Sequence, residues 1–208
     1  MPPLLKGLAI GFSIAAPVGP IGLLCIRCTL VHGRLNGFLC GLGAATADAC
    51  YGVVAALGLS AVTTLALGAQ PWLQGAGGLF LLGLGLKTLR AAPSQPSSPA
   101  TVDAAALAAG YSSTFLLTLA NPMTILSFLG IFAGLGVGAA SGGTLAAGWL
   151  VLGVFLGSAA WWLALSVATG WLGARLRQGG LRTVNVASGL VIAGFGAWQL
   201  AALLRSLR

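Results

Sequence analysis

Charged residues, and acidic residues above all, are scarce in this chain of 208 residues. It contains 10 lysines and arginines but only 2 acidic residues, and charged residues make up 6% of the total. A soluble domain carries about 25% charged residues, so this chain could not cover a soluble surface. Hydrophobic residues make up 58%, and the mean hydropathy is +1.00. The composition excludes a soluble domain and predicts an all-α polytopic membrane protein.

Groups that catalyse reactions or bind metals are scarce as well. There is one histidine, His32, and the four cysteines all lie in the first half of the chain. Cys25 and Cys28 have the spacing of half a zinc site, but the sequence has no second pair of cysteine or histidine ligands. It contains no serine–histidine–aspartate set, phosphate-binding loop or cofactor fingerprint. We therefore predict no enzyme activity, no bound metal and no cofactor.

The basic residues give the chain a formal net charge of +8. In a soluble protein such a charge would suggest nucleic acid as a partner. Here the basic residues lie at the ends of apolar runs, where they anchor helices at the membrane surface and set the topology. We therefore predict the lipid bilayer, and no nucleic acid, as the partner of this charge. By the positive-inside rule, the first, third and fifth connectors face the cytoplasm.

Six apolar segments are each close to or above the roughly 20 residues that a spanning helix needs. They cover about residues 4–26, 37–67, 72–89, 104–137, 144–172 and 184–204. A polar connector at 27–36 follows the first segment, and Pro71 opens the third. The over-long second segment is expected either to tilt or to end near Ser60 with an interfacial turn. A linker at 91–103, rich in proline and serine, divides the chain into halves of three segments each, residues 1–90 and 104–208.

The two halves resemble each other in sequence. The pattern G-L-x-x-x-G-x-G begins at Gly78 in the third segment and at Gly189 in the sixth. The second and fifth segments also match, with Asp48 and Ser158 at equivalent positions. A repeat with an odd number of spans is inverted relative to its copy. The pattern therefore predicts a 3+3 inverted repeat, which is a recurrent design of transporters.

Prolines interrupt the first and fourth segments at matching positions. Pro17 and Pro20, separated by Val18 and Gly19, break the first, and Asn121-Pro122 breaks the fourth. A proline inside a helix removes an amide donor and clashes with the preceding turn. In a membrane such a break is tolerated where protein or a water-filled cavity satisfies the freed backbone groups. Breaks in both halves favour a binding site over the alternative, in which each proline simply kinks its helix.

Asp48 is the only acidic residue inside a membrane segment, since the other, Asp103, lies in the linker. A charge at the centre of a span costs about 2.5–3.5 kcal/mol on insertion scales, so such a residue is rarely idle. Its partner could be a substrate cation, a proton, an inorganic ion or the ends of helices. The alternative is a protonated or interfacial aspartate with a structural hydrogen bond. Tyr51, three residues on, is expected on the same helical face.

Broken helices should also expose helix ends, and a helix N-terminus offers free amide donors and a positive dipole to a carboxylate. Asn121 would cap the helix that follows it. Together with Asp48, these groups would complement a zwitterion. The predicted substrate-binding residues are Pro17, Gly19, Pro20, Asp48, Tyr51, Asn121 and Pro122. Three serines could also line the site, namely Ser13, Ser127 and Ser158.

Three stretches of the chain resemble the LysE/RhtB family of amino-acid exporters. They read GFSIAAPVGPIGLLCIR from Gly11, GFLCGLGAATADACYG from Gly37 and LANPMTILSF from Leu119. The likeness covers nearly the whole chain, with all six segments in order. By the motif match, the positions carried over are Pro17, Gly19, Pro20, Asp48, Asn121 and Pro122. Members often have a second basic residue after Arg27, where this chain has Cys28.

The resemblance implies a multi-pass protein of the cytoplasmic (inner) membrane that exports amino acids such as lysine, arginine, threonine or homoserine. The proton gradient or the membrane potential would drive export by alternating access. In our leading hypothesis Asp48 takes the ammonium group of the substrate, or alternates between proton and substrate and so couples the two. The alternative is a metal or inorganic ion transporter or channel of the same fold. A third class, a membrane-bound enzyme or assembly factor, lacks any catalytic constellation. The oligomeric state stays open, with a homodimer as one option.

Overall fold

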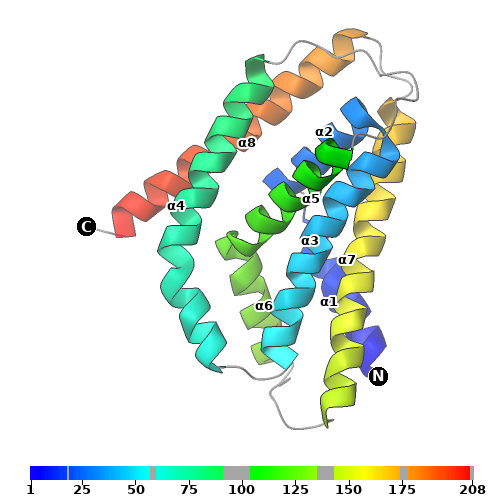
Figure 1. Cartoon of the computed structure of the whole chain (residues 1–208), viewed down its shortest axis with the longest axis vertical. Helices are drawn as coiled ribbons and strands as arrows, with labels where there is room; N and C mark the ends of the chain where they lie inside the picture. Colours follow the sequence, from blue (N-terminus) through cyan, green and yellow to red (C-terminus); the bar gives the residue numbers. More distant parts are fainter. Residues whose placement is uncertain (18, 57–59, 91–103, 135–142, 174–177, 207–208) are drawn as a thin grey trace.

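A computed structural model describes residues 1–17, 19–56, 60–90, 104–134, 143–173 and 178–206, and these residues form helices and no strands (Figure 1). The helices are α1 (Pro3–Ala15), α2 (Pro20–His32), α3 (Arg34–Ala56), α4 (Ser60–Arg90), α5 (Ala104–Leu119), α6 (Pro122–Gly134), α7 (Gly143–Gly173) and α8 (Gln178–Ser206). The predicted all-helical class is confirmed. The predicted linker lies outside the described residues.

Several of the described helices are long and apolar enough to cross a membrane. Three qualify alone, and their spanning parts are Arg34–Ala56, Gly143–Gly173 and Asn185–Arg205. A fourth qualifies if α1 and α2, which meet at an angle of 84°, count as one broken span. The chain is therefore a multi-pass membrane protein, while the count of six spans stays a prediction.

Two predicted segment boundaries were wrong. The polar connector at 27–36 is helical except at Gly33, because polar residues mark where a helix leaves the bilayer and not where it ends. Gly33 turns the chain with a φ of 91°, a conformation that glycine adopts without steric cost. Pro71 does not open a helix but lies inside α4. The apolar run 37–67 spans the end of α3 and the start of α4 at Ser60, in agreement with the expectation that the second segment ends near that residue.

Glycines bring α1 against α7. A Cβ atom on Gly7 would collide with the carbonyl of Leu150, and one on Gly11 would collide with that of Val154. Later residues of α1 contact later residues of α7, so the two helices run parallel. Small residues allow membrane helices to approach at backbone distance, which gains dispersion energy where no hydrophobic effect operates between helices.

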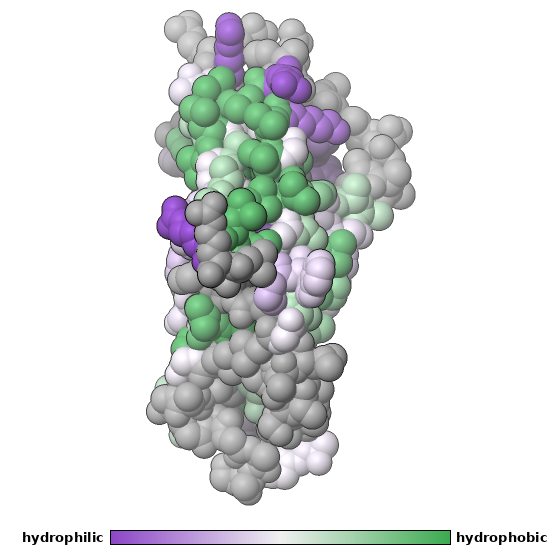
Figure 2. Space-filling model, turned by 90° about the vertical axis from the view of Figure 1, so that its left-hand side faces the viewer, coloured by the Kyte–Doolittle hydropathy of each residue, from purple (hydrophilic) through white to green (hydrophobic). Residues whose placement is uncertain are grey.

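The second close pair is α4 and α8, which run antiparallel on the opposite side of the molecule (Figure 1). Gly78 lies against Leu200, and Gly85 lies against the backbone of Ala193. Hydrophobic side chains cover much of the upper half of the face that this pair presents (Figure 2). Its exposed residues include Leu79, Phe80, Leu190, Val191 and Trp198. Such a surface is stable against lipid chains and unstable against water.

Helix α3 lies between α5 and α7 and contacts both along its length (Figure 1). Toward α7, Gly41 faces Trp162 and Gly52 faces Val154, so these two helices are antiparallel. Toward α5, the Thr114 hydroxyl donates a hydrogen bond to the Cys40 carbonyl.

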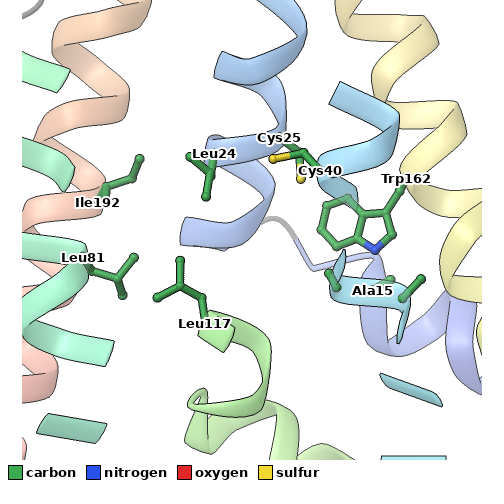
Figure 3. Close-up of a cluster of buried hydrophobic side chains, with 10 residues drawn as sticks. Ala15, Leu24, Cys25, Cys40, Leu81, Leu117, Trp162 and Ile192 are labelled. Carbon is green, nitrogen blue, oxygen red and sulfur yellow. The ribbon is translucent and has the colours of Figure 1, made fainter. Parts of the chain in front are cut away.

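A buried apolar cluster joins the α4–α8 pair to the remaining helices. Leu81 of α4 and Ile192 of α8 face Leu24 of α2 and Leu117 of α5 (Figure 3). All four side chains are buried. The α4–α8 pair therefore packs on α2 and α5 largely through apolar side chains that lie next to the two helix breaks.

Candidate functional site

Helices α2 and α6 each begin with a proline that follows a break. Pro20 occupies the first position of α2 and Pro122 that of α6. The amide of Leu23 donates to the Gly19 carbonyl at 3.0 Å, and that of Thr124 donates to the Asn121 carbonyl at 3.1 Å. Proline is favoured at a first helical position, because its missing N–H would have no partner in the helix there.

The two breaks line one cavity. Its walls come from α2, the α5–α6 break, α4 and α8, and the lining residues are Pro20, Ile21, Gly77, Leu81, Leu117, Ala120, Asn121, Phe195 and Gln199. Pro20 and Asn121, far apart in sequence, are thus brought together. The cavity volume is about 10 Å³, which is enough for about one water molecule. In this conformation the cavity is too small for an amino acid.

Asp48 is not among the residues that line this cavity and lies against α7. Ser158 donates a hydrogen bond from Oγ to Asp48 Oδ2 at 2.7 Å, and Trp162 Nε1 donates to Ser158 Oγ at 3.1 Å. All three side chains are at least 95% buried. The indole N–H can only donate, so it leaves the single hydroxyl proton of Ser158 directed at the carboxyl group.

Tyr51 connects α3 to the second break. Its hydroxyl donates to the carbonyl of Leu119, the last residue of α5, at 2.6 Å. The final carbonyls of a helix lack partners within that helix, and Pro122 prevents α5 from continuing. Tyr51 therefore satisfies a backbone group that the break leaves free, as the membrane environment requires.

The predicted residues thus fall into separate places. Asp48 accepts a hydrogen bond from Ser158 of α7, whereas Tyr51 bonds to the carbonyl at the end of α5. Gly19 precedes α2 in an extended conformation, with φ −104° and ψ −162°. Pro17 is exposed at the first break. Of the predicted serines, Ser158 takes part in the Asp48 network.

The prediction from sequence missed Gln199. This residue is 2% exposed and lines the cavity, and within the described chain its side-chain oxygen Oε1 has no hydrogen-bond partner. A polar residue within the apolar run 184–204 was the available signal. It was easy to overlook, because polar residues near the end of a span usually point to the membrane surface.

Three cysteines lie close together where α2 meets α3. The Sγ atoms of Cys28 and Cys40 are 3.2 Å apart, and Cys25 belongs to the same buried cluster as Cys40. All are free thiols. Within the described residues, no group of three or more histidine, cysteine or acidic side chains could hold a metal ion.

Apolar spanning helices define the class as a multi-pass membrane protein, in which two helix breaks meet at one cavity. The sequence model of the LysE type translocator family matches residues 12–202, and the chain belongs to this family. The family resemblance is thereby confirmed.

A relative in Bacillus subtilis (strain 168) is 30% identical over 128 residues, and its name is "Putative amino acid efflux protein YcgF". The match covers 62% of this chain and 61% of that protein, so the chain spans about three fifths of the relative's length. No solved structure matches the chain.

Proposed function

We propose that this protein exports amino acids across the cytoplasmic membrane by alternating access. The observation that carries the proposal is that α2 and α6 both begin at one cavity, with Pro20 and Asn121 in its wall. Transporters commonly hold their substrate near the bilayer midplane between discontinuous helices. Membership of the translocator family and the efflux name of the Bacillus relative support the same function.

The two helix beginnings suit the carboxylate of an amino acid. The first amides of α2 and α6, including that of Ile21, have no partner in their own helices and carry the positive end of the helix dipole. Anions bind at such positions. Gly19 and Pro122 would shape the two helix beginnings, while Pro17 would keep α1 from running into α2.

A 3+3 inverted repeat is part of this proposal, and the surroundings of the repeated glycines support it. Gly78 lies against Leu200, and its counterpart Gly189 lies against Leu89. Gly85 lies against the backbone of Ala193, and its counterpart, Gly196, lies against the backbone of Leu82. Each of these α4 residues has its equivalent in α8 at the same distance along the sequence. If the two halves are exchanged, the first contact of each pair therefore becomes the second.

The middle glycines of the repeated pattern also share one environment. Among the residues that the structure describes, a Cβ atom on Gly83 or on Gly194 would meet nothing within 4 Å. Asp48 and Ser158 occupy equivalent positions and bond to each other. An inverted repeat brings equivalent residues together only at its two-fold axis, so the Asp48–Ser158 bond would lie on that axis.

We assign proton coupling to Asp48, with α3 as the connecting element. The same helix carries Asp48 against Ser158 of α7 and Tyr51 against the Leu119 carbonyl at the second break. When Asp48 takes up or releases a proton, the charge next to α7 changes. Unpaired charge is costly inside a membrane. A resulting shift of α3 would act through Tyr51 on the start of α6 and thus on the cavity.

Proteoliposomes would test this proposal. We expect wild-type protein to exchange at least one of a panel of labelled amino acids by counterflow, and to drive net export under a pH gradient. Asp48→Asn should keep counterflow and lose gradient-driven export, because the amide cannot carry the proton. Asp103→Asn, the same change at the other acid of the chain, is the matched control and should leave both activities intact.

Two outcomes would count against the proposal. A wild-type protein that exchanges no amino acid but passes labelled cations would overturn amino-acid export in favour of ion transport. Undiminished gradient-driven export by Asp48→Asn would remove Asp48 from the coupling mechanism and leave the substrate assignment standing.

A further inference from the structure

Gln199 presents an unpaired acceptor in the cavity wall. The backbone carbonyl of this residue accepts a hydrogen bond from Gln74 Nε2 at 3.1 Å, while its side-chain Oε1 is buried without a partner among the described residues. A buried acceptor left unsatisfied costs about 1–3 kcal/mol. Polar groups in that condition usually have a ligand, a water molecule or another functional reason to be there.

The position of Gly77 locates this oxygen within the cavity. A Cβ atom on Gly77 would lie 3.2 Å from Ala120 Cβ and 3.8 Å from Gln199 Oε1. The space in front of Gly77 is therefore bounded by the second break on one side and by Oε1 on the other. A side chain at position 77 would occupy the space between Ala120 and Gln199 Oε1, and the glycine leaves that space open.

The charges around the cavity decide what this oxygen can bind. The starts of α2 and α6 present amide donors and positive dipole ends, which attract a carboxylate and repel an ammonium group. Asp48 lies against α7 and does not offer its carboxylate here. The Gln199 amide oxygen is an acceptor from a different helix, α8, in the wall of the same cavity.

We propose that Gln199 binds the α-ammonium group of the transported amino acid through Oε1, while the starts of α2 and α6 bind its carboxylate. This assignment rests on the amino-acid export proposed above. The substrate then bridges the α4–α8 pair and the helices that carry the breaks. The cavity, at about 10 Å³, has to widen by separation of these parts before the substrate enters, and closes again around the bound substrate.

Counterflow in proteoliposomes with paired competitors would test the assignment. The pairs are L-threonine with 3-hydroxybutyrate and L-lysine with 6-aminohexanoate, in which the second compound lacks only the α-ammonium group. A hydrogen bond to a charged group contributes about 1.5–3 kcal/mol, which is about ten- to hundredfold in affinity. Gln199→Leu should raise the half-saturation concentration of the exchanged amino acid by that factor and leave inhibition by its desamino partner unchanged.

Two variants keep the result interpretable. Gln199→Glu retains an acceptor oxygen and should retain affinity for the amino acid, which covers the case in which Gln199→Leu fails to fold. Gln74→Leu removes a glutamine from the same α4–α8 interface outside the cavity and should leave the half-saturation concentration unchanged.

Equal loss of affinity for the amino acid and its desamino partner in Gln199→Leu would overturn the assignment, since it indicates a structural or water-binding role. Wild-type affinity in Gln199→Leu would overturn it as well. Failure of the proposed function looks different, because then the wild-type protein itself exchanges neither amino acid, and the assignment fails with it.

Discussion

Replacement of Tyr51 by phenylalanine tests whether the second helix break is held in place by α3. The hydroxyl of Tyr51 donates to the Leu119 carbonyl at 2.6 Å, immediately before the break. Phenylalanine keeps the ring, which packs against Phe128 with centroids 5.5 Å apart. The substitution thus removes one hydrogen bond and leaves the apolar contact in place.

The structure sets the size of the expected effect. Hydrogen bonds between membrane helices average about 0.6 kcal/mol, with a maximum of about 1.7 kcal/mol. The upper end applies to Tyr51, because the break leaves the Leu119 carbonyl without the helical donor that would otherwise replace the hydroxyl. We call the conformation described above, in which Tyr51 bonds to the Leu119 carbonyl and the cavity is small, the closed conformation. A loss of about 1.4 kcal/mol reduces its population about tenfold. If each transport cycle passes through that conformation, counterflow should slow by up to that factor.

Tyr111→Phe is the matched control. Its hydroxyl donates to Thr46 Oγ1 at 2.9 Å, between the same helices α3 and α5 but away from the break. Both groups in this bond are side chains, and Thr46 also bonds to the Leu42 carbonyl at 2.8 Å. The average of about 0.6 kcal/mol therefore applies, and counterflow should fall no more than about threefold.

Initial counterflow rates in proteoliposomes, with thermal unfolding of each variant in detergent, would measure the difference. Both variants should unfold a few degrees below wild type, since a loss of about 1 kcal/mol shifts the midpoint by about 2–4 °C in a chain of this size. Equal slowing of counterflow by the two variants would refute the reasoning, because it would reduce the role of Tyr51 to general helix packing. Wild-type counterflow in Tyr51→Phe would refute it too.

Two further predictions concern buried serines and packed glycines. Ser158→Ala removes the hydroxyl that donates to Asp48 and should weaken gradient-driven export. Ser166→Ala on the same helix removes a buried Oγ that has no partner among the described residues, and it should leave gradient-driven export unchanged. Gly85→Ala should lower stability by about 1–3 kcal/mol in thermal unfolding, because its Cβ would strike the backbone of α8. Gly83→Ala, which faces open space on the same helix, should raise stability by about 0.5–1 kcal/mol. Equal effects within either pair would contradict these expectations.

The sequence alone was sufficient for features that depend on local chemistry. The shortage of charge determined a membrane protein, because no folding pattern could hide so much apolar surface from water. The starts of α2 and α6 follow from Pro20 and Pro122, because the missing N–H and the restricted φ of proline are local properties that do not depend on tertiary contacts. The motifs that carry the family resemblance are also a property of the sequence.

Hydropathy did not reveal where helices turn or which side they bury. In a membrane the lipid-facing and protein-facing surfaces are both apolar, so the period of hydrophobic residues carries little information about the core. For this reason hydropathy left open whether the second segment tilts as one long helix or ends near Ser60, where α4 begins. Glycine is equally ambiguous, because Gly83 faces open space while Gly85, two residues on, touches the backbone of α8.

Only the tertiary structure decided which polar groups meet. Both breaks reach one cavity because α2 and α5 pack together against the α4–α8 pair. The same packing turns Asp48 toward α7 and brings Gln199, which the sequence did not single out, to the cavity wall. Contacts between distant segments depend on how whole helices fit against one another, and no local property of a residue determines that fit.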